Sequence, residues 1–217
     1  MIRAVIYDMD GTLVDSERVS DGAWQKAGKR YGVELSLELI HSFIGVNTRV
    51  CLSILADHLD GDANLARRLF DAHVEEFNKI CAVNLPVKPG ARESIDAMRA
   101  EGLAVGLATS SRSDRARERL ALVGLRDAFD SLTCGDELER SKPEPDIFLE
   151  AARRLGADPA ECAVVEDSYN GVRAGYAAGM HVFMVPDLLP PTPEIEAMCD
   201  AVLDTLFDLH AAVCAVR

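Results

Sequence analysis

The pattern of apolar and polar residues divides the chain into two kinds of segment. Short apolar runs alternate with amphipathic stretches from about residue 87 onward, and one further run lies near the start of the chain. Continuous apolar runs are typical of strands that are buried on both faces of a parallel sheet. The runs predicted as strands are 4–7, 104–108, 131–134, 163–165, 182–185 and 201–203.

The stretches between these strands have helical periodicity. The helices predicted there span 91–100, 114–122, 146–155 and 170–178. Alternating strands and helices form right-handed crossover units, which build a parallel sheet with helices on both faces. The sequence therefore predicts an α/β fold.

Residues 17–82 break this alternation. Their apolar residues recur at helical spacing, so we expect about four helices inserted after the first strand. The prolines and the glycine of residues 84–90 indicate the return to the sheet. The expected organisation is a core of residues 1–16 and 83–217 with a helical cap of residues 17–82 that acts as a lid.

Charge and hydropathy exclude several partners. The 217 residues carry a formal net charge of −13, which disfavours binding to nucleic acid or to an anionic membrane. No apolar run approaches the roughly 18 residues of a membrane span. The first apolar run contains acidic residues, unlike a signal peptide. We expect a cytoplasmic protein that is a monomer or a weak homo-oligomer.

The metal-binding and redox residue types show no local pattern. The cysteines have no C-x-x-C pair and the histidines have no metal-ligand spacing; the cysteines are Cys51, Cys81, Cys134, Cys162, Cys199 and Cys214. Free, buried thiols in a reducing cytosol are therefore expected, rather than disulfides or a zinc site. The chain also has no Walker motif and no dinucleotide-binding glycine motif.

Two acidic residues end the first apolar run. Asp8 and Asp10 are two positions apart, so both side chains can converge just beyond the carboxyl end of a strand. Ligands bind at this end of open α/β sheets. Two close carboxylates repel each other unless a cation or a shared proton separates them. The alternative is a simple Asp-Gly turn with a solvated acid beside it.

Three more polar groups follow predicted strands. They are Thr109, Ser110 and Ser111; then Lys142; and finally Glu166 and Asp167. The hydroxyls precede a helix, where backbone N–H groups bind anions, although simple capping explains them too. The two prolines that follow Lys142 hold it in a rigid turn suited to a phosphate, the alternative being a surface lysine. Asp167 could equally be the N-cap of the next helix.

Taken together, these groups predict one site. Oxygen ligands without histidine or cysteine favour a hard cation, for which Mg²⁺ is the expected choice. A cation held by acids beside an anion-binding surface is typical of a site for phosphoryl chemistry.

The motifs also resemble a known family. They are Asp8-Met9-Asp10-Gly11-Thr12, Thr109-Ser110, Lys142 in a Ser-Lys-Pro-Glu-Pro run, and Glu166-Asp167-Ser168 with Gly171. Their order and spacing resemble the haloacid dehalogenase superfamily over essentially the whole chain, in the branch of the β-phosphoglucomutase-like phosphatases. The resemblance implies a Rossmann-like core with an inserted helical cap.

The resemblance also implies a role for each motif. Asp8 would be the nucleophile that forms an aspartyl-phosphate. Asp10 would protonate the leaving oxygen and later deprotonate the attacking water. Mg²⁺ would be held by Asp8, the backbone carbonyl of Asp10, Glu166 and Asp167. The phosphoryl oxygens would be bound by Thr109, Ser110 and Lys142.

The cap bears on the choice between two activities. In β-phosphoglucomutase itself, a histidine of the first cap helix helps to activate the sugar hydroxyl, and here Ser20 takes its place. Arg49, in Gly45-Val46-Asn47-Thr48-Arg49, is a candidate substrate-binding residue or a solvated surface arginine. The expected function is therefore a Mg²⁺-dependent phosphatase of small metabolites, sugar or polyol phosphates foremost. The alternative is a β-phosphoglucomutase-type phosphomutase.

Overall fold

The computed structural model describes residues 1–44, 46 and 48–216, and the chain forms two compact units. The first unit comprises Met1–Asp15 and Pro86–Arg217, and the second comprises Ser16–Leu85. The chain leaves and re-enters the first unit through paired segments, in which the Asp15 N–H donates to the Pro86 carbonyl and the Lys88 N–H to the Leu13 carbonyl, both at 2.9 Å.

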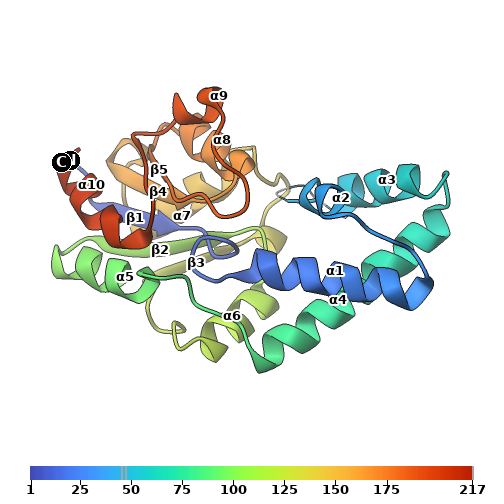
Figure 1. The fold of residues 1–217 in the computed structure, drawn as a ribbon. Coiled ribbons are helices and arrows are strands. Elements are labelled where there is room, and N and C mark those ends of the chain that lie inside the picture. Colours follow the sequence, from blue (N-terminus) through green and yellow to red (C-terminus); the bar gives the residue numbers. More distant parts are fainter. Residues whose placement is uncertain (45, 47, 217) are drawn as a thin grey trace. The chain divides into compact units, whose positions relative to one another are not determined.

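The first unit is built on a parallel sheet (Figure 1). Its described strands are β1 (Ala4–Tyr7), β2 (Ala104–Thr109), β3 (Ser131–Cys134), β4 (Cys162–Glu166), β5 (His181–Met184) and β6 (Ala201–Val202). Their order is β3-β2-β1-β4-β5-β6, and every pair is parallel. The α/β class with a Rossmann-like parallel sheet is confirmed, and the strand bounds agree with the prediction to within one residue.

Helices cover both faces of this sheet (Figure 1). The helices α5 (Ala91–Ala100) and α6 (Ser113–Leu122) lie on one face, and α7 (Asp146–Leu155) and α8 (Tyr169–Ala177) lie on the other. Short elements complete the unit: α9 (Pro193–Glu196), α10 (Leu209–Ala215) and the 3₁₀ turns η1 (Gly135–Glu137), η2 (Pro159–Glu161) and η3 (Leu206–Asp208). The sequence pattern had not indicated α9 or α10, because neither is long enough for a clear helical period.

Strand register decides which residues meet at the carboxyl end of the sheet. Tyr7 of β1 is level with Leu107 of β2 and Val165 of β4. The next residue of each strand or strand end therefore falls in one row, which consists of Asp8, Ala108 and Glu166. The central position of β1 places Asp8 in the middle of this row.

The second unit is helical. It consists of α1 (Ser16–Tyr31), α2 (Leu37–His41), α3 (Thr48–His58) and α4 (Ala63–Val83). Its interior contains an aromatic cluster, in which the ring of Trp24 packs on Phe43 at a centroid distance of 5.0 Å and stacks on His73 at 4.0 Å. This unit begins and ends slightly outside the predicted residues 17–82, because α1 begins at Ser16 and Leu85 is buried after α4 ends.

Two further expectations concern exposure. No helix in the described part of the chain is both long and apolar enough to cross a membrane. The cysteines are free thiols, and Cys51, Cys81, Cys134 and Cys162 are buried as expected. The expectation was wrong for Cys214, which is exposed, and Cys199 is only half-buried. Cys214 lies near the end of the short helix α10, where the side of the helix away from Leu209 and Val213 faces solvent.

Candidate functional site

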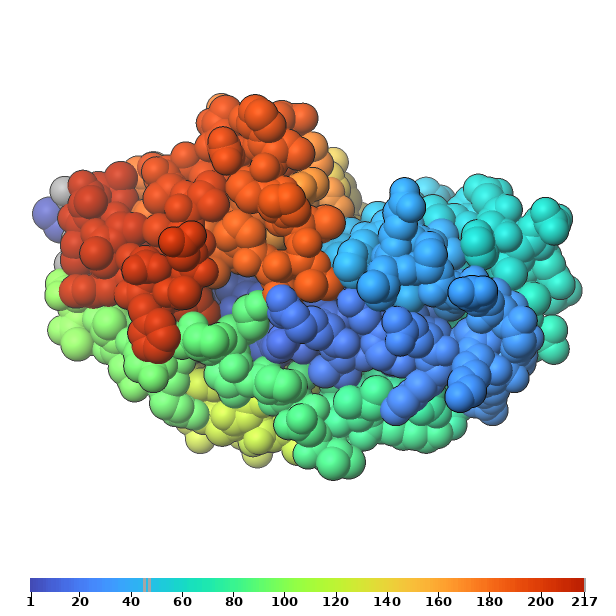
Figure 2. Space-filling model, viewed as in Figure 1, coloured from blue at the N-terminus to red at the C-terminus, as the bar shows by residue number. Residues whose placement is uncertain are grey.

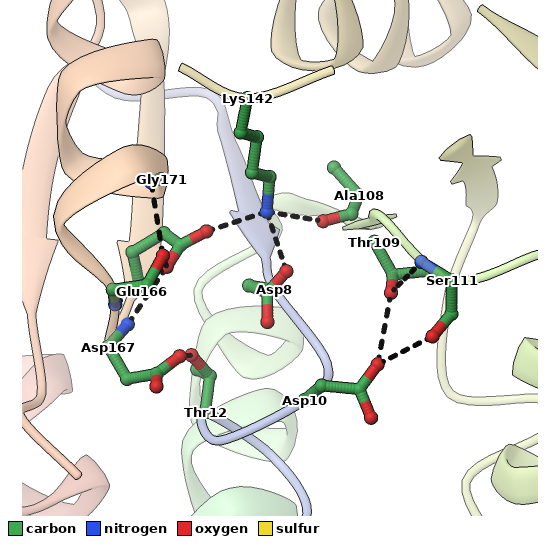
Figure 3. A network of polar contacts seen from close by, with 11 residues as sticks. Asp8, Asp10, Thr12, Ala108, Thr109, Ser111, Lys142, Glu166, Asp167 and Gly171 are labelled. Atoms are coloured by element: carbon green, nitrogen blue, oxygen red, sulfur yellow. Dashed lines mark hydrogen bonds and ion pairs between the residues drawn. The ribbon is translucent and has the colours of Figure 1, made fainter. Parts of the chain in front are cut away.

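The carboxyl end of the sheet holds a buried cluster of charged side chains (Figure 3). Asp8 follows β1, Glu166 ends β4 and Asp167 follows it, and the three residues are 6%, 1% and 5% exposed. One carboxylate oxygen from each lies within 4.8 Å of those of the other two. The parallel register and the strand ends thus bring together residues that are more than 150 positions apart.

Lys142 neutralises part of this charge (Figure 3). Its Nζ donates to Asp8 Oδ1 and Glu166 Oε1, both at 2.6 Å, and to the Ala108 carbonyl at 3.2 Å. These three acceptors are the row that the strand register lines up. The ammonium also lies 4.8 Å from the ring centre of Phe148, which adds a cation–π contact. Lys142 is therefore a buried part of the cluster and not a surface lysine.

Burial and charge act against each other on the titration of this pair. Burial raises the pKa of Asp8 to about 8, although the Lys142 ammonium opposes the rise. Burial lowers the pKa of Lys142, but the Asp8 and Glu166 carboxylates outweigh it, so the net shift is upward. The site thus keeps its lysine charged and disfavours a second negative charge beside Glu166.

Asp167 is held by the loop that follows β1. The Thr12 hydroxyl donates to Asp167 Oδ1 at 2.9 Å. Between Asp10 and Thr12 the backbone turns at Gly11, whose φ is +88°, and a Cβ there would lie 2.2 Å from Asp167 Oδ2. Glycine satisfies both the backbone conformation and the close approach. The Asp-Gly-Thr sequence thus fits the first loop tightly against the acid after β4.

Glu166 is held from both of its oxygens. Oε1 accepts from Lys142, and Oε2 accepts from the N–H groups of Asp167 and Ser168 at 3.0 Å and from the Ser168 hydroxyl at 2.9 Å. A Cβ at Gly171 in α8 would lie 1.8 Å from the Glu166 carboxyl carbon, so this helix can approach only with glycine there. Ser168, and not Asp167, is the N-cap of α8, since its hydroxyl accepts from the Gly171 N–H.

Asp10 points toward a different set of partners (Figure 3). Its Oδ2 accepts from the Ser111 hydroxyl at 2.7 Å and from the Thr109 hydroxyl at 3.4 Å. Its Oδ1 accepts from an Arg119 guanidinium nitrogen at 2.8 Å, and the same nitrogen contacts the Ser111 hydroxyl at 3.2 Å. The Arg119 side chain is 11% exposed.

Sequence reasoning had not assigned Arg119 to the site. It appears in the sequence as one of four arginines between 112 and 119, and three of them are exposed. Only Arg119 falls on the side of α6 that faces the loop after β1, one turn after the buried Ala116. The helical spacing from Ala116 and to Leu120 is a signal that could have singled it out.

Two predicted residues are exposed, Ser110 in the first unit and Arg49 in the second. Ser110 is exposed in the loop after β2, where its neighbour Ser111 supplies the hydroxyl that contacts Asp10. Arg49 is exposed on α3 of the second unit. The Gly45 and Asn47 positions of its motif lie outside the described residues.

The chain is similar in sequence to known hydrolases. Residues 2–179 match a family model described as haloacid dehalogenase-like hydrolase. The chain is 35% identical over 213 residues to a phosphoglycolate phosphatase of Nitrosospira multiformis, covering 95% of this chain and 93% of the relative. It is 30% identical over 211 residues to hexitol phosphatase B of Escherichia coli, covering 97% and 95%.

A solved structure is also similar. It is a HAD family hydrolase from Deinococcus radiodurans with bound phosphate and sodium, at a TM-score of 0.80 and 29% identity. The similarity covers 99% of this chain and 96% of that one. The likeness therefore includes both the sheet and the inserted helices.

Proposed function

The chain belongs to the haloacid dehalogenase-like hydrolases, and on this premise we propose that it is a Mg²⁺-dependent phosphatase of small phosphorylated metabolites. Sugar and polyol phosphates are the first substrates to consider, because one relative is a hexitol phosphatase. The phosphoglycolate phosphatase among the relatives adds a small phosphorylated acid to that list.

One observation carries the proposal, and it is the charge balance of the buried cluster. Three carboxylates, from Asp8, Glu166 and Asp167, lie together, and the Lys142 ammonium contacts those of Asp8 and Glu166. When all three are ionised, they carry two more negative charges than Lys142 carries positive charge. A divalent cation would balance them, and oxygen-only ligands in a buried site suit Mg²⁺.

The resemblance to the family suggests which residues would hold Mg²⁺. Asp8, the backbone carbonyl of Asp10 and Asp167 are the proposed ligands, with Glu166 as a fourth candidate. Both oxygens of Glu166 already accept hydrogen bonds, so its first contribution is to hold Lys142. When bound, Mg²⁺ supplies positive charge that lets an anionic phosphoryl group approach Asp8.

The chain's own residues would then carry out the reaction in two steps. An Asp8 oxygen attacks the phosphorus, the bond from phosphorus to the ester oxygen breaks, and Asp10 gives that oxygen a proton. Next, water gives a proton to Asp10 and attacks the phosphorus. The bond between Asp8 and phosphorus breaks, releasing inorganic phosphate and restoring both aspartates. Lys142 and the Thr109 and Ser110 region would stabilise the phosphoryl oxygens.

Asp10 must be held in a defined orientation to transfer protons, and Arg119 helps to hold it there. The guanidinium and the Ser111 hydroxyl each hold one of its two oxygens. Small errors in the position of a catalytic group lower rates strongly. We include Arg119 in the proposal as a positioning residue for Asp10.

The helical unit is proposed to cap this site and to select the substrate. Arg49 remains a candidate for substrate binding there. In the same unit, Ser20 accepts or donates a hydrogen bond with His73 Nε2 at 3.0 Å. The phosphomutase alternative needs a group in the cap that activates a sugar hydroxyl. His73 is the histidine beside Ser20, and burial lowers its pKa to about 4. This half-buried imidazole gives no specific support to the phosphomutase alternative.

The test is phosphate release from a panel of compounds with Mg²⁺ and with a chelator. The panel contains hexitol phosphates, sugar phosphates, phosphoglycolate, nucleotides and β-glucose 1-phosphate, and phosphorus NMR follows the products. Asp8→Asn should reduce turnover by at least about 10³-fold while leaving the circular dichroism spectrum unchanged. The matched control is Asp204→Asn, which changes an exposed aspartate of the same unit and should retain activity.

The outcomes separate the two activities. Phosphate release that disappears in Asp8→Asn supports the phosphatase, and the best compound of the panel identifies the substrate class. Conversion of β-glucose 1-phosphate to the 6-phosphate without phosphate release would show the phosphomutase instead. Full activity in Asp8→Asn would overturn the assignment of the nucleophile in either case.

A further inference from the structure

A second cluster of metal-ligand side chains lies on the surface of the first unit, away from the carboxyl end of the sheet. It consists of Glu101, directly after α5, and of His210 and Cys214, both on α10. One ligand atom from each residue lies within 4.8 Å of those of the other two. We propose that these three side chains form a site for a borderline divalent transition metal such as Zn²⁺.

The helix supplies the first pair of ligands. His210 and Cys214 are four residues apart on α10, so both side chains project from one face of the helix. The Cys214 Sγ lies 3.6 Å from the His210 Nε2. Two ligands at this helical spacing form a recurring half of a metal site. The sequence had predicted no zinc site because the cysteines form no C-x-x-C pair and the histidines have no metal-ligand spacing.

Tertiary packing supplies the third ligand. Leu206, Leu209 and Val213 are buried at the base of the C-terminal segment and hold α10 against the core. Figures 1 and 2 show this red C-terminal segment at the surface beside the green residues of α5. The contact brings Glu101 Oε1 to 3.2 Å from His210 Nε2. Residues 101 and 210 thus meet only because α10 docks beside the end of α5.

Two of the three separations between ligand atoms are close to those around a tetrahedral ion. Bonds of about 2.0 to 2.3 Å place the ligand atoms of tetrahedral Zn²⁺ roughly 3.3 to 3.8 Å apart. The observed 3.2 Å between oxygen and nitrogen and 3.6 Å between nitrogen and sulfur are close to these values. Small rotations of side chains that are 44% exposed at His210 and 37% at Glu101 would complete the geometry. Water would occupy the fourth position.

The donor types distinguish this site from the buried cluster. An imidazole, a thiolate and a carboxylate favour Zn²⁺, Co²⁺ or Ni²⁺ over Mg²⁺, which prefers oxygen alone. Binding would release the proton of the Cys214 thiol, because the thiolate is the ligand. The metal would link α10 to the end of α5. A seven-residue helix gains little stability from its own hydrogen bonds, so this link would stabilise the C-terminal segment.

The test uses Co²⁺ as a spectroscopic probe on the full, reduced chain, with excess Mg²⁺ present to occupy the oxygen cluster. One equivalent of Co²⁺ should produce the near-ultraviolet absorption of a cobalt–thiolate bond, and Zn²⁺ should displace it. Cys214→Ser should abolish the band. Cys199→Ser, which removes the other cysteine that is not buried, should retain it. His210→Gln and Glu101→Gln should each weaken Co²⁺ binding by about 10-fold or more.

A second measurement is independent of the thiolate spectrum. Zn²⁺ should raise the thermal unfolding temperature of the unmodified chain and should raise that of His210→Gln less. The proposal is overturned if the cobalt band persists in Cys214→Ser, or if no band forms at a stoichiometric ratio. Asp167→Asn should leave the cobalt titration unchanged, so this result and the phosphatase test stand or fall separately.

Discussion

The two units of the chain bury polar side chains in opposite ways. In the first unit, Lys142 is buried while charged, because Asp8 and Glu166 accept its hydrogen bonds. In the second unit, His73 is half-buried and stacks on Trp24, and this burial lowers its pKa to about 4. One interior therefore retains charge and the other excludes it.

This difference follows from what each unit is built of. Parallel strands end at one edge of the sheet, so their terminal polar residues meet and can compensate one another. The helical unit packs the aromatic rings of Trp24, Phe43 and Phe70 together, and burying a charge among such rings costs free energy unless the charge is paired. Chemistry that needs charge is therefore expected in the first unit, and shape selection in the second.

The largest effect is expected from removing the buried cation. Lys142→Met leaves Asp8 and Glu166 adjacent without their ammonium, so we expect a loss of about 3 to 5 kcal/mol in the free energy of unfolding. Urea unfolding without added metal measures this loss. Phosphatase activity should disappear as well.

A double variant sharpens the same comparison. Lys142→Met combined with Asp8→Asn removes one of the two unpaired carboxylates, so part of the lost stability should return. Equal stability of the single and double variants would show that the ammonium contributes nothing to compensating Asp8.

The second prediction concerns pH and the helical unit. The pKa of His73 is about 4 in the folded chain and 6.5 at its ordinary value. The unfolded chain therefore binds the proton first as the pH falls. The stability linked to His73 is complete above pH 6.5 and is lost as the pH falls from 6.5 to 4, by about 3 kcal/mol in total.

Trp24 provides the measurement, since it is the single tryptophan and stacks on His73. Its fluorescence during urea unfolding should show a midpoint that falls between pH 7 and pH 4.5. The His73→Gln variant carries no titrating ring at this place. Its midpoint should fall less over the same range, and an equal fall in both proteins would contradict the prediction.

The third prediction tests the support of Asp10. Arg119→Met should lower kcat by about 10- to 100-fold with little change in KM, because Asp10 loses the group that holds one of its oxygens. Arg119→Lys keeps the charge without the planar guanidinium, so its kcat should lie between that of the unmodified chain and that of Arg119→Met. Arg117→Met is the matched control on the same helix, as Arg117 is exposed. Steady-state kinetics on the best substrate of the panel separates kcat from KM.

The smallest effect is expected from a surface change in the helical unit. Gly22 lies inside α1, and a Cβ there would have no heavy atom within 4 Å. Gly22→Ala should therefore raise the free energy of unfolding by up to about 1 kcal/mol. Thermal unfolding measures it, and the activity of the first unit should not change. A lower free energy of unfolding in Gly22→Ala would contradict the prediction and show that the fold does not tolerate a methyl group beside Gly22.

The sequence by itself determined the α/β class, the strands and the order of the polar groups at the strand ends. These follow from local periodicity and from the rule that parallel strands end at one edge, so Asp8, Lys142 and Asp167 could be placed together without coordinates. The long inserted helices α1, α3 and α4 could be predicted equally well, since each carries an apolar stripe, whereas α2 has only five residues.

Only the tertiary structure decided which side chains touch across elements. Glu166 pairs with Lys142 through strand register, Arg119 reaches Asp10 through the rotation of α6, and His210 meets Glu101 through the docking of α10. These contacts depend on distances of a few ångströms between elements remote in sequence. Periodicity specifies which face of a helix is buried, but packing alone sets which residue that face meets.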